Sequence, residues 1–204
     1  MPRLHPNIVD ANRRKIERVA LRLFCAQGFH GTSMREIATR SHVSLGNIYN
    51  YYKTKDELFT SIVNHYGQVM NTQRDRLLES IHAPFERDEI LGLASRIRDV
   101  VYRYGDFWLL MYVDVTEFRN RHFEKFFLGL ADEFRNRFRR EFSQPQLRRG
   151  LKGLDPGMVF AAMWMQFFNY FLVERLFRGR RHFGMADAAV VKGLSQMYER
   201  VWRR

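Results

Sequence analysis

The sequence lacks the features of a disulfide-stabilised or membrane-spanning protein. Its 204 residues include one cysteine, Cys25, so no internal disulfide can form. Because Cys25 lies in an apolar helical pattern, we interpret it as an inert buried thiol, with a redox sensor as the alternative. The most apolar stretch, residues 158–173, is interrupted by Gln166 and Asn169 and is shorter than the ~20 residues that cross a bilayer. The amino-terminal residues contain no secretory signal, so we expect a cytoplasmic protein.

The sequence also contains few of the residue patterns that catalysis or metal binding requires. Its histidines show no helical pairing with cysteine or carboxylate of the kind that a zinc site needs. There is no phosphate-binding glycine loop and no nucleophile elbow. Asp114 and Glu117 lie one helical turn apart and could serve acid–base chemistry, but we interpret them as a solvated pair or as partners of Arg119 or Arg121. We expect no enzyme, no metal and no cofactor.

Basic residues are in clear excess. The chain has 34 Lys and Arg against 22 Asp and Glu, which gives a net charge of +12. This excess favours polyanionic partners such as nucleic acid, acidic membrane surfaces or acidic proteins. With 46% hydrophobic residues the chain can bury a substantial core, and no segment shows strand alternation. The expected fold class is therefore all-α.

The first sixty residues begin with two predicted helices. Apolar residues recur at helical spacing from Ile16 onward among basic residues, and Gly28 ends this first helix. Ser33 and Glu36 form a capping box, in which each side chain would satisfy a free amide of the other's turn. The second helix is therefore expected to begin at Met34 and to run to about residue 40.

A third helix follows a short turn, and Ser44 is expected to cap it. Ile48 and Tyr52 would face inward. The outward residues are then Leu45, Asn47, Tyr49, Asn50 and Tyr51. Asparagine can pair with an adenine edge, leucine can touch a thymine methyl group, and tyrosine hydroxyls can reach phosphates. We infer a helix-turn-helix that reads the major groove of duplex DNA; the alternative is a small three-helix bundle with a solvated basic face.

Two further positions indicate a nearby phosphate. Gly46 lowers helix propensity by about 1 kcal/mol relative to alanine, which suggests that the helix start approaches the DNA backbone closely. Thr54 is placed to cap a fourth helix, and Lys55 adds a positive charge at its amino end. That charge is unfavourable unless an anion is bound there.

Together, these residues resemble the DNA-binding domain of the tetracycline-repressor (TetR) family over about the first sixty residues. The resemblance implies that Leu45, Asn47 and Arg35 face bases and that Ser33, Tyr49, Tyr51 and Lys55 hold phosphates. The full set of predicted DNA-binding residues is Ser33, Arg35, Ser44, Leu45, Asn47, Tyr49, Asn50, Tyr51 and Lys55.

Two positions depart from the family pattern. His42 stands where the family usually has glycine, so it must adopt a left-handed conformation or form a different turn. Tyr52 replaces the common phenylalanine, so its hydroxyl needs a hydrogen-bond partner.

The rest of the chain is predicted to be helical over residues 58–81, 90–104, 107–113, 123–142, 156–177 and 190–201. The apolar segment 107–113 is expected to be surrounded by protein on every side. The helix that starts at Asp155–Pro156 is apolar on nearly its whole circumference, so with the last helix it would form a symmetric four-helix dimer interface. We predict a DNA-binding domain over residues 1–56 and an effector-binding and dimerisation domain over residues 57–204.

The sequence is rich in aromatic and methionine residues, with 18 Phe, nine Met and three Trp. Core and interface packing is one explanation. The resemblance implies another, a cavity that binds a small apolar or aromatic effector. The candidate lining residues are Phe107, Trp108, Met111, Tyr112, Phe126, Phe127, Trp164, Phe167 and Phe168.

These observations favour a homodimeric, ligand-responsive transcriptional regulator that binds a palindromic operator, and we expect a repressor. The alternative is a DNA-binding architectural or nucleoid-associated protein that has no effector. A helical enzyme that retained the DNA reader is a third possibility, but it would need a catalytic constellation that the sequence does not contain.

Overall fold

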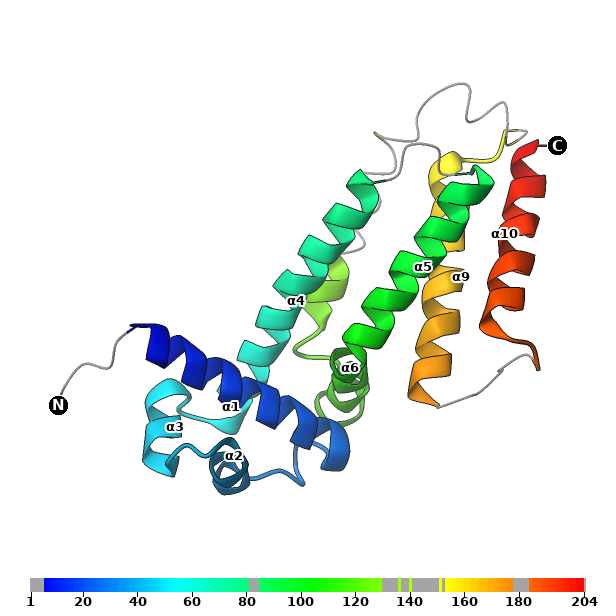
Figure 1. Ribbon diagram of the computed structural model, residues 1–204. Helices are drawn as coiled ribbons and strands as arrows, with labels where there is room; N and C mark the ends of the chain where they lie inside the picture. Colours follow the sequence, from blue (N-terminus) through cyan, green and yellow to red (C-terminus); the bar gives the residue numbers. More distant parts are fainter. Residues whose placement is uncertain are drawn as a thin grey trace. The chain divides into compact units, whose positions relative to one another are not determined.

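The computed structural model describes residues 6–80, 85–129, 136, 140, 151, 153–177 and 184–203. Every regular element in these ranges is a helix, so the predicted all-α class is confirmed (Figure 1). The helices are α1 (Pro6–Gln27), α2 (Met34–Ser41), α3 (Leu45–Tyr51), α4 (Lys55–Glu79), α5 (Arg87–Arg103), α6 (Gly105–Phe118), α9 (Pro156–Leu176) and α10 (Asp187–Arg203). Most of the helix expected over residues 123–142 and of the loop that follows lies outside the described residues.

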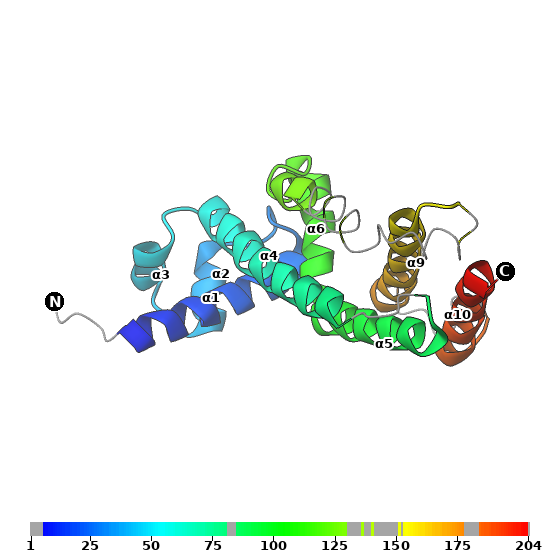
Figure 2. The ribbon, with the colours of Figure 1, turned by 90° about the horizontal axis from the view of Figure 1, so that it is seen from above.

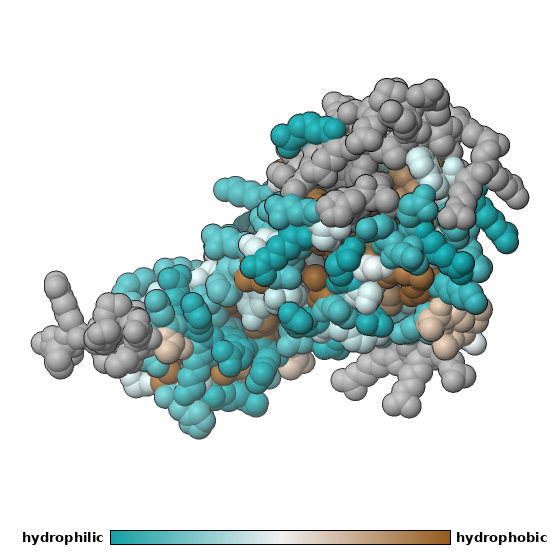
Figure 3. All heavy atoms as spheres, turned by 45° about the horizontal axis from the view of Figure 1, so that its top comes forward, coloured by the Kyte–Doolittle hydropathy of each residue, from teal (hydrophilic) through white to brown (hydrophobic). Residues whose placement is uncertain are grey.

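The chain forms two compact units. Unit 1 comprises Met1–Val69 and Asp106–Phe126, and unit 2 comprises Met70–Gly105 and Phe127–Arg204. The packing therefore groups α6 with the first three helices, and the boundary predicted at residue 56 falls inside unit 1. The functional division at that residue remains a prediction. On the face shown in Figure 3, hydrophilic residues predominate over the part of unit 1 that holds the first helices.

The start of α2 is capped as predicted, but only half of the expected capping box forms. The Oγ of Ser33 accepts a hydrogen bond from the Glu36 amide at 3.1 Å. The Glu36 carboxylate instead accepts a bond from Gln27 at 2.7 Å and pairs with Arg40 at 3.1 Å. Glu36 therefore ties α1 to α2 and stabilises α2 along its length.

The turn between α2 and α3 contains a residue in the left-handed backbone conformation. His42 has φ 52° and ψ 40°, which decides between the two conformations considered for this position. Beyond the turn, the Oγ of Ser44 accepts a bond from the Asn47 amide at 3.3 Å. Ile48 and Tyr52 are buried, with 0% and 1% exposure. The predicted cap and inward face of α3 are therefore confirmed.

Aromatic rings form much of the core of unit 1. The ring of Phe29 lies 4.5 Å from that of Phe118 and 5.7 Å from that of Phe59, measured between centroids. This cluster joins the end of α1 to α4 and to α6. The prediction that segment 107–113 is enclosed on every side is wrong, because Tyr112 is 44% exposed. One face of α6 packs into unit 1 and the other remains open.

In unit 2, α5 packs against both α9 and α10 (Figures 1 and 2). The predicted start of α9 is confirmed, since an Asp155 side-chain oxygen accepts a bond from the Met158 amide at 2.9 Å and Pro156 opens the helix. The hydroxyl of Tyr198 on α10 donates to Gln166 on α9 at 2.7 Å. Residues 162 and 165 of α9 point away from these contacts and are exposed.

Candidate nucleic-acid interface

The outward face of α3 is accessible in the way that groove reading requires. Tyr49 and Asn50 are exposed, and Leu45, Asn47 and Tyr51 are partly exposed. A Cβ atom built on Gly46 would meet no atom within 4 Å, so nothing inside the protein explains this glycine. The other predicted contact residues on this side, Ser33, Arg35 and Ser44, are also exposed.

A polar cluster fixes the carboxyl end of α3 to its neighbours. The Tyr52 hydroxyl donates to Glu17 Oε1 at 2.7 Å and accepts from Arg13 Nε at 3.1 Å. The Ser61 hydroxyl donates to the same Glu17 oxygen at 2.8 Å. Burial raises the pKa of Tyr52 to about 12, and Glu17 is only 4% exposed. The hydroxyl that sets Tyr52 apart from phenylalanine therefore bonds to α1.

Sequence reasoning did not find this cluster, although a signal was present. Glu17 directly follows the buried Ile16 and precedes the buried Ala20 by three residues, which places a carboxylate on the apolar stripe of α1. A carboxylate in that position needs partners from other elements.

Replacing Tyr52 with phenylalanine should lower the free energy of unfolding by about 1 kcal/mol, because Glu17 loses one of its buried donors. The affinity of the folded Tyr52→Phe variant for DNA should not change. Tyr51→Phe is the matched control, and it should weaken DNA binding roughly fivefold with stability unchanged. Urea unfolding and fluorescence anisotropy measure the two quantities. Equal effects of both variants on both quantities would contradict the assignment.

Lys55 is held by the protein itself. Its Nζ donates to the carbonyl oxygens of Phe29 and Thr32, each at 2.6 Å, and lies 4.2 Å from the centre of the Phe29 ring. Burial lowers the pKa of this ammonium. The interpretation that only a phosphate could relieve its charge is therefore wrong, because two carbonyls of the α1–α2 loop do so. A phosphate contact by Lys55 remains a prediction.

Glu117 holds the loop between α1 and α2. Its carboxylate accepts hydrogen bonds from the amides of Phe29 at 2.9 Å and His30 at 2.8 Å. Gly28 has φ 78°, and a Cβ on it would lie 2.5 Å from Glu117 Oε1, so glycine is required for both reasons. The carboxylate of α6 thus positions the loop that leads into α2.

Asp114 is not solvated, contrary to the sequence interpretation. Its side chain is fully buried and accepts bonds from the amides of His122 at 3.1 Å and Phe123 at 3.0 Å. The His122 ring nitrogen Nδ1 lies 2.6 Å from Asp114, and Nε2 lies 3.4 Å from Asp56 at the start of α4. Arg121 pairs with Asp56 rather than with Asp114 or Glu117. Both carboxylates serve unit 1 as structural acceptors.

The structure divides the nine predicted effector-pocket residues between the two units. Phe107, Trp108, Met111, Tyr112 and Phe126 fall in unit 1; Phe127, Trp164, Phe167 and Phe168 fall in unit 2. Phe107 is fully buried and stacks on Tyr66 with 5.7 Å between ring centroids. Phe167 is also fully buried. Each of these two rings lies in the core of its own unit. The pocket role of all nine residues remains a prediction.

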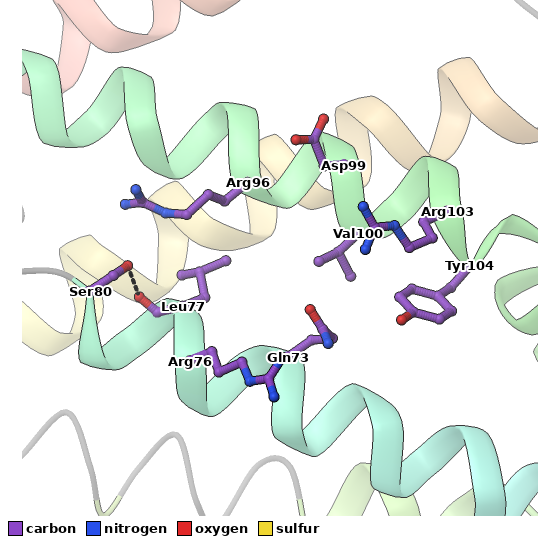
Figure 4. A pocket seen from close by; sticks show the side chains of 9 residues that line it. All are labelled: Gln73, Arg76, Leu77, Ser80, Arg96, Asp99, Val100, Arg103 and Tyr104. Carbon is purple, nitrogen blue, oxygen red and sulfur yellow. Dashed lines mark hydrogen bonds between the residues drawn. The ribbon is translucent and has the colours of Figure 1, made fainter.

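A pocket of about 220 Å³ lies within unit 2, between the second half of α4 and α5 (Figure 4). None of the nine predicted residues lines it. Its wall includes Arg76 from α4 and Arg96 and Arg103 from α5. No sequence motif pointed to this site, because the contributing residues come from two helices at unrelated spacings.

Other chemical possibilities gain no support among the described residues. The Cys25 thiol donates to the Asp106 carbonyl at 3.1 Å, and burial raises its pKa to about 12, which favours an inert thiol. In the ranges that the structure describes, no three His, Cys, Asp or Glu side chains converge as metal ligands. The same part of the chain contains no helix with the length and apolarity needed to span a bilayer.

Comparison with known proteins decides the family. Residues 16–62 match the profile described as bacterial regulatory proteins, tetR family. The amino-terminal domain belongs to the TetR family. The matched segment is therefore similar to regulatory proteins and not to a catalytic domain. The matched residues run from the buried stripe of α1 through the helix-turn-helix into the first half of α4.

Relatives of this TetR-type chain are similar in sequence mainly at the amino-terminal end. The transcriptional regulator HbdR of Aromatoleum sp. (strain CIB) is 30% identical over 82 residues, which is 40% of this chain and 36% of HbdR. The probable regulator YttP of Bacillus subtilis is 26% identical over 106 residues, which is 52% of this chain and 51% of YttP. The chain thus spans about half or less of the length of these curated relatives.

Solved structures share the fold over nearly the whole chain. AibR in complex with isovaleryl coenzyme A and operator DNA has a TM-score of 0.61 and 19% identity, and the match covers 91% of this chain and 97% of AibR. At this identity the similarity shows a TetR-type fold for both parts of the chain.

Proposed function

We propose that the protein is a homodimeric, ligand-responsive repressor of transcription that binds palindromic operator DNA. The observation that carries this proposal is the capped α2–α3 pair, in which Ile48 and Tyr52 are buried while the polar face of α3 is open. A helix presented in this way fits the width of the major groove. AibR, which shares the fold, was solved with operator DNA and an acyl coenzyme A.

The proposed division of labour on α3 follows from side-chain chemistry. Leu45, Asn47 and, from α2, Arg35 would meet base edges, because amide, guanidinium and methyl groups suit the major-groove pattern. The exposed hydroxyls and the ammonium of the predicted set would meet phosphates; these residues are Ser33, Ser44, Tyr49, Tyr51 and Lys55. Asn50 lies beside them on the exposed face.

The proposed response to an effector uses α6. Glu117 of α6 holds the α1–α2 loop, and Asp114 of α6 holds His122, which contacts Asp56 of α4. A shift of α6 would therefore move the reader helices with it. An effector changes the population of two arrangements only by its difference in binding free energy between them.

The proposed dimer uses α9 and α10. On α9 the exposed residues Met158, Ala162, Met165 and Asn169 recur at spacings of four, three and four, which is the periodicity of a helix–helix seam. Met158 is 72% exposed and Met165 is 68% exposed, an unusual state for large apolar side chains. A symmetric pair of chains would cover them and place two readers about one DNA turn, ~34 Å, apart.

Selection from randomised duplexes with the full chain tests the proposal. We expect a palindromic consensus with two half-sites and a footprint confined to it. Asn47→Ala should reduce discrimination at one position of each half-site by about 1–3 kcal/mol, because a bidentate amide contact is lost. Asn71→Ala, at an exposed asparagine of α4 outside the predicted contact set, is the matched control and should keep full discrimination. Broad, salt-sensitive coverage without a consensus would instead support an architectural DNA-binding protein.

A further inference from the structure

The pocket between α4 and α5 is strongly basic. Arg76, Arg96 and Arg103 contribute three cations to its lining, against one carboxylate from Asp99 (Figure 4). The carboxylate of Asp99 lies 3.3 Å from Arg98, which does not line the pocket. The lining therefore carries an excess of positive charge that residues within the pocket do not neutralise.

Arg96 is the most informative of the three cations. Its Nε and one Nη nitrogen are buried and have no hydrogen-bond acceptor. That Nη forms an ion pair with Glu89 at 3.9 Å, which is too long for a hydrogen bond, and the Arg96 side chain as a whole is 39% exposed. A buried guanidinium donor without an acceptor is unfavourable, because it has lost its hydrogen bonds to water and gained none within the protein. An anion in the pocket would meet the exposed part of this side chain, and a small turn of the guanidinium would give the buried nitrogens an acceptor.

The helix is also shaped around this guanidinium. Gly92 lies four residues before Arg96, and a Cβ atom there would be 3.2 Å from the Arg96 Nη1 nitrogen. Glycine in the middle of α5 weakens the helix, but here it lets the guanidinium lie close against the helix. Leu77 and Val100 give the same pocket an apolar part.

We propose that this pocket binds a small amphipathic anion, whose carboxylate or phosphate group pairs with Arg96 while a short alkyl portion packs on Leu77 and Val100. The inference rests on the proposed function, because it assigns this anion as the effector class. Guanidinium groups bind carboxylate and phosphate through paired, charge-assisted hydrogen bonds, which suits either head group. A cavity of about 220 Å³ has room for a ligand of a few carbon atoms.

Isothermal titration of the full chain with hexanoate, hexyl phosphate and 1-hexanol tests the site. The three probes share an alkyl chain, so they isolate the head group and distinguish carboxylate from phosphate. We expect at least one anion to bind about tenfold or more tightly than the alcohol. Equal binding of all three, or no binding of either anion, would overturn the proposal.

Substitutions assign the binding to the pocket. Arg96→Gln should weaken anion binding about tenfold or more, whereas Arg87→Gln, an exposed position at the start of the same helix and outside the lining, should leave it within twofold. Arg103→Gln provides a second lining variant if Arg96→Gln lowers the melting temperature. Unchanged affinity in every folded lining variant would overturn the site.

The effector role is tested separately from the DNA-binding function. The selected operator duplex is titrated with the full chain in the presence and absence of the bound anion. A change of at least threefold in DNA affinity, abolished by Arg96→Gln, supports the effector assignment. Sequence-specific DNA binding that ignores a bound anion overturns that assignment and leaves the proposed DNA reader standing. Loss of sequence-specific binding in the wild-type chain overturns the proposed function itself.

Discussion

Replacing Met165 with glutamate should convert the proposed dimer to a monomer and weaken binding to a two-half-site operator more than about a hundredfold. Met165 is 68% exposed in the single chain and lies within the proposed seam of exposed residues on α9. In a dimer it would be buried, and an unpaired carboxylate there would be strongly unfavourable. A monomer holds one half-site alone and loses the effective concentration that joins two sites, which is worth about 10²–10⁴ in affinity.

Val115→Glu is the control for this substitution. Val115 is also an exposed apolar residue, 50% exposed, but it lies on α6 in unit 1 and outside the proposed seam. Its variant should remain dimeric and bind the operator within about threefold of wild type. Sedimentation equilibrium gives the assembly state, and anisotropy with full and half operators gives the affinities. A dimeric Met165→Glu variant that binds the full operator normally would sink the proposed interface.

Features that depend on neighbouring residues were predictable from the sequence. Ser33, Ser44 and Asp155 each cap the helix that follows, because a side-chain oxygen reaches an amide two or three residues ahead and little else competes. The inward positions of α3 were predictable for the same reason, since 3.6-residue periodicity fixes which residues share a face.

Contacts between distant residues were not predictable in this way. Glu117 and Phe29 are 88 positions apart, and no spacing rule tells that a carboxylate on α6 will accept the amides of a loop after α1. At Lys55, contacts between distant residues overturned an interpretation based on the local sequence. Its local setting at a helix amino end suggested a phosphate, but tertiary packing brought it the carbonyls of Phe29 and Thr32.

The effector site illustrates a further difficulty. A high content of phenylalanine favours a core and an aromatic cavity equally well, and Phe107 and Phe167 entered the core. The basic pocket depends on which faces of α4 and α5 lie opposite one another.

Replacing Asp114 with alanine should lower the free energy of unfolding by about 3–5 kcal/mol, the largest stability effect that we expect for a single substitution in unit 1. The carboxylate is fully buried and accepts two amide bonds, and it lies 2.6 Å from the His122 ring. Its removal leaves buried amides without acceptors and an imidazole without its partner. Each such group contributes a desolvation penalty of about 1–3 kcal/mol.

Asp114→Asn should cost less than the alanine variant, because both backbone amides donate to the same oxygen, Oδ2, which the asparagine amide oxygen can replace. Glu124→Ala removes an exposed carboxylate ten residues further along the chain and should change stability by less than about 0.5 kcal/mol. Urea unfolding of the three variants at one pH measures the series. Equal stability of Asp114→Ala and Glu124→Ala would contradict the structural role of Asp114.

Since His122 also contacts Asp56 at the start of α4, loss of Asp114 should raise amide exchange in the first turn of α4 before the chain unfolds globally.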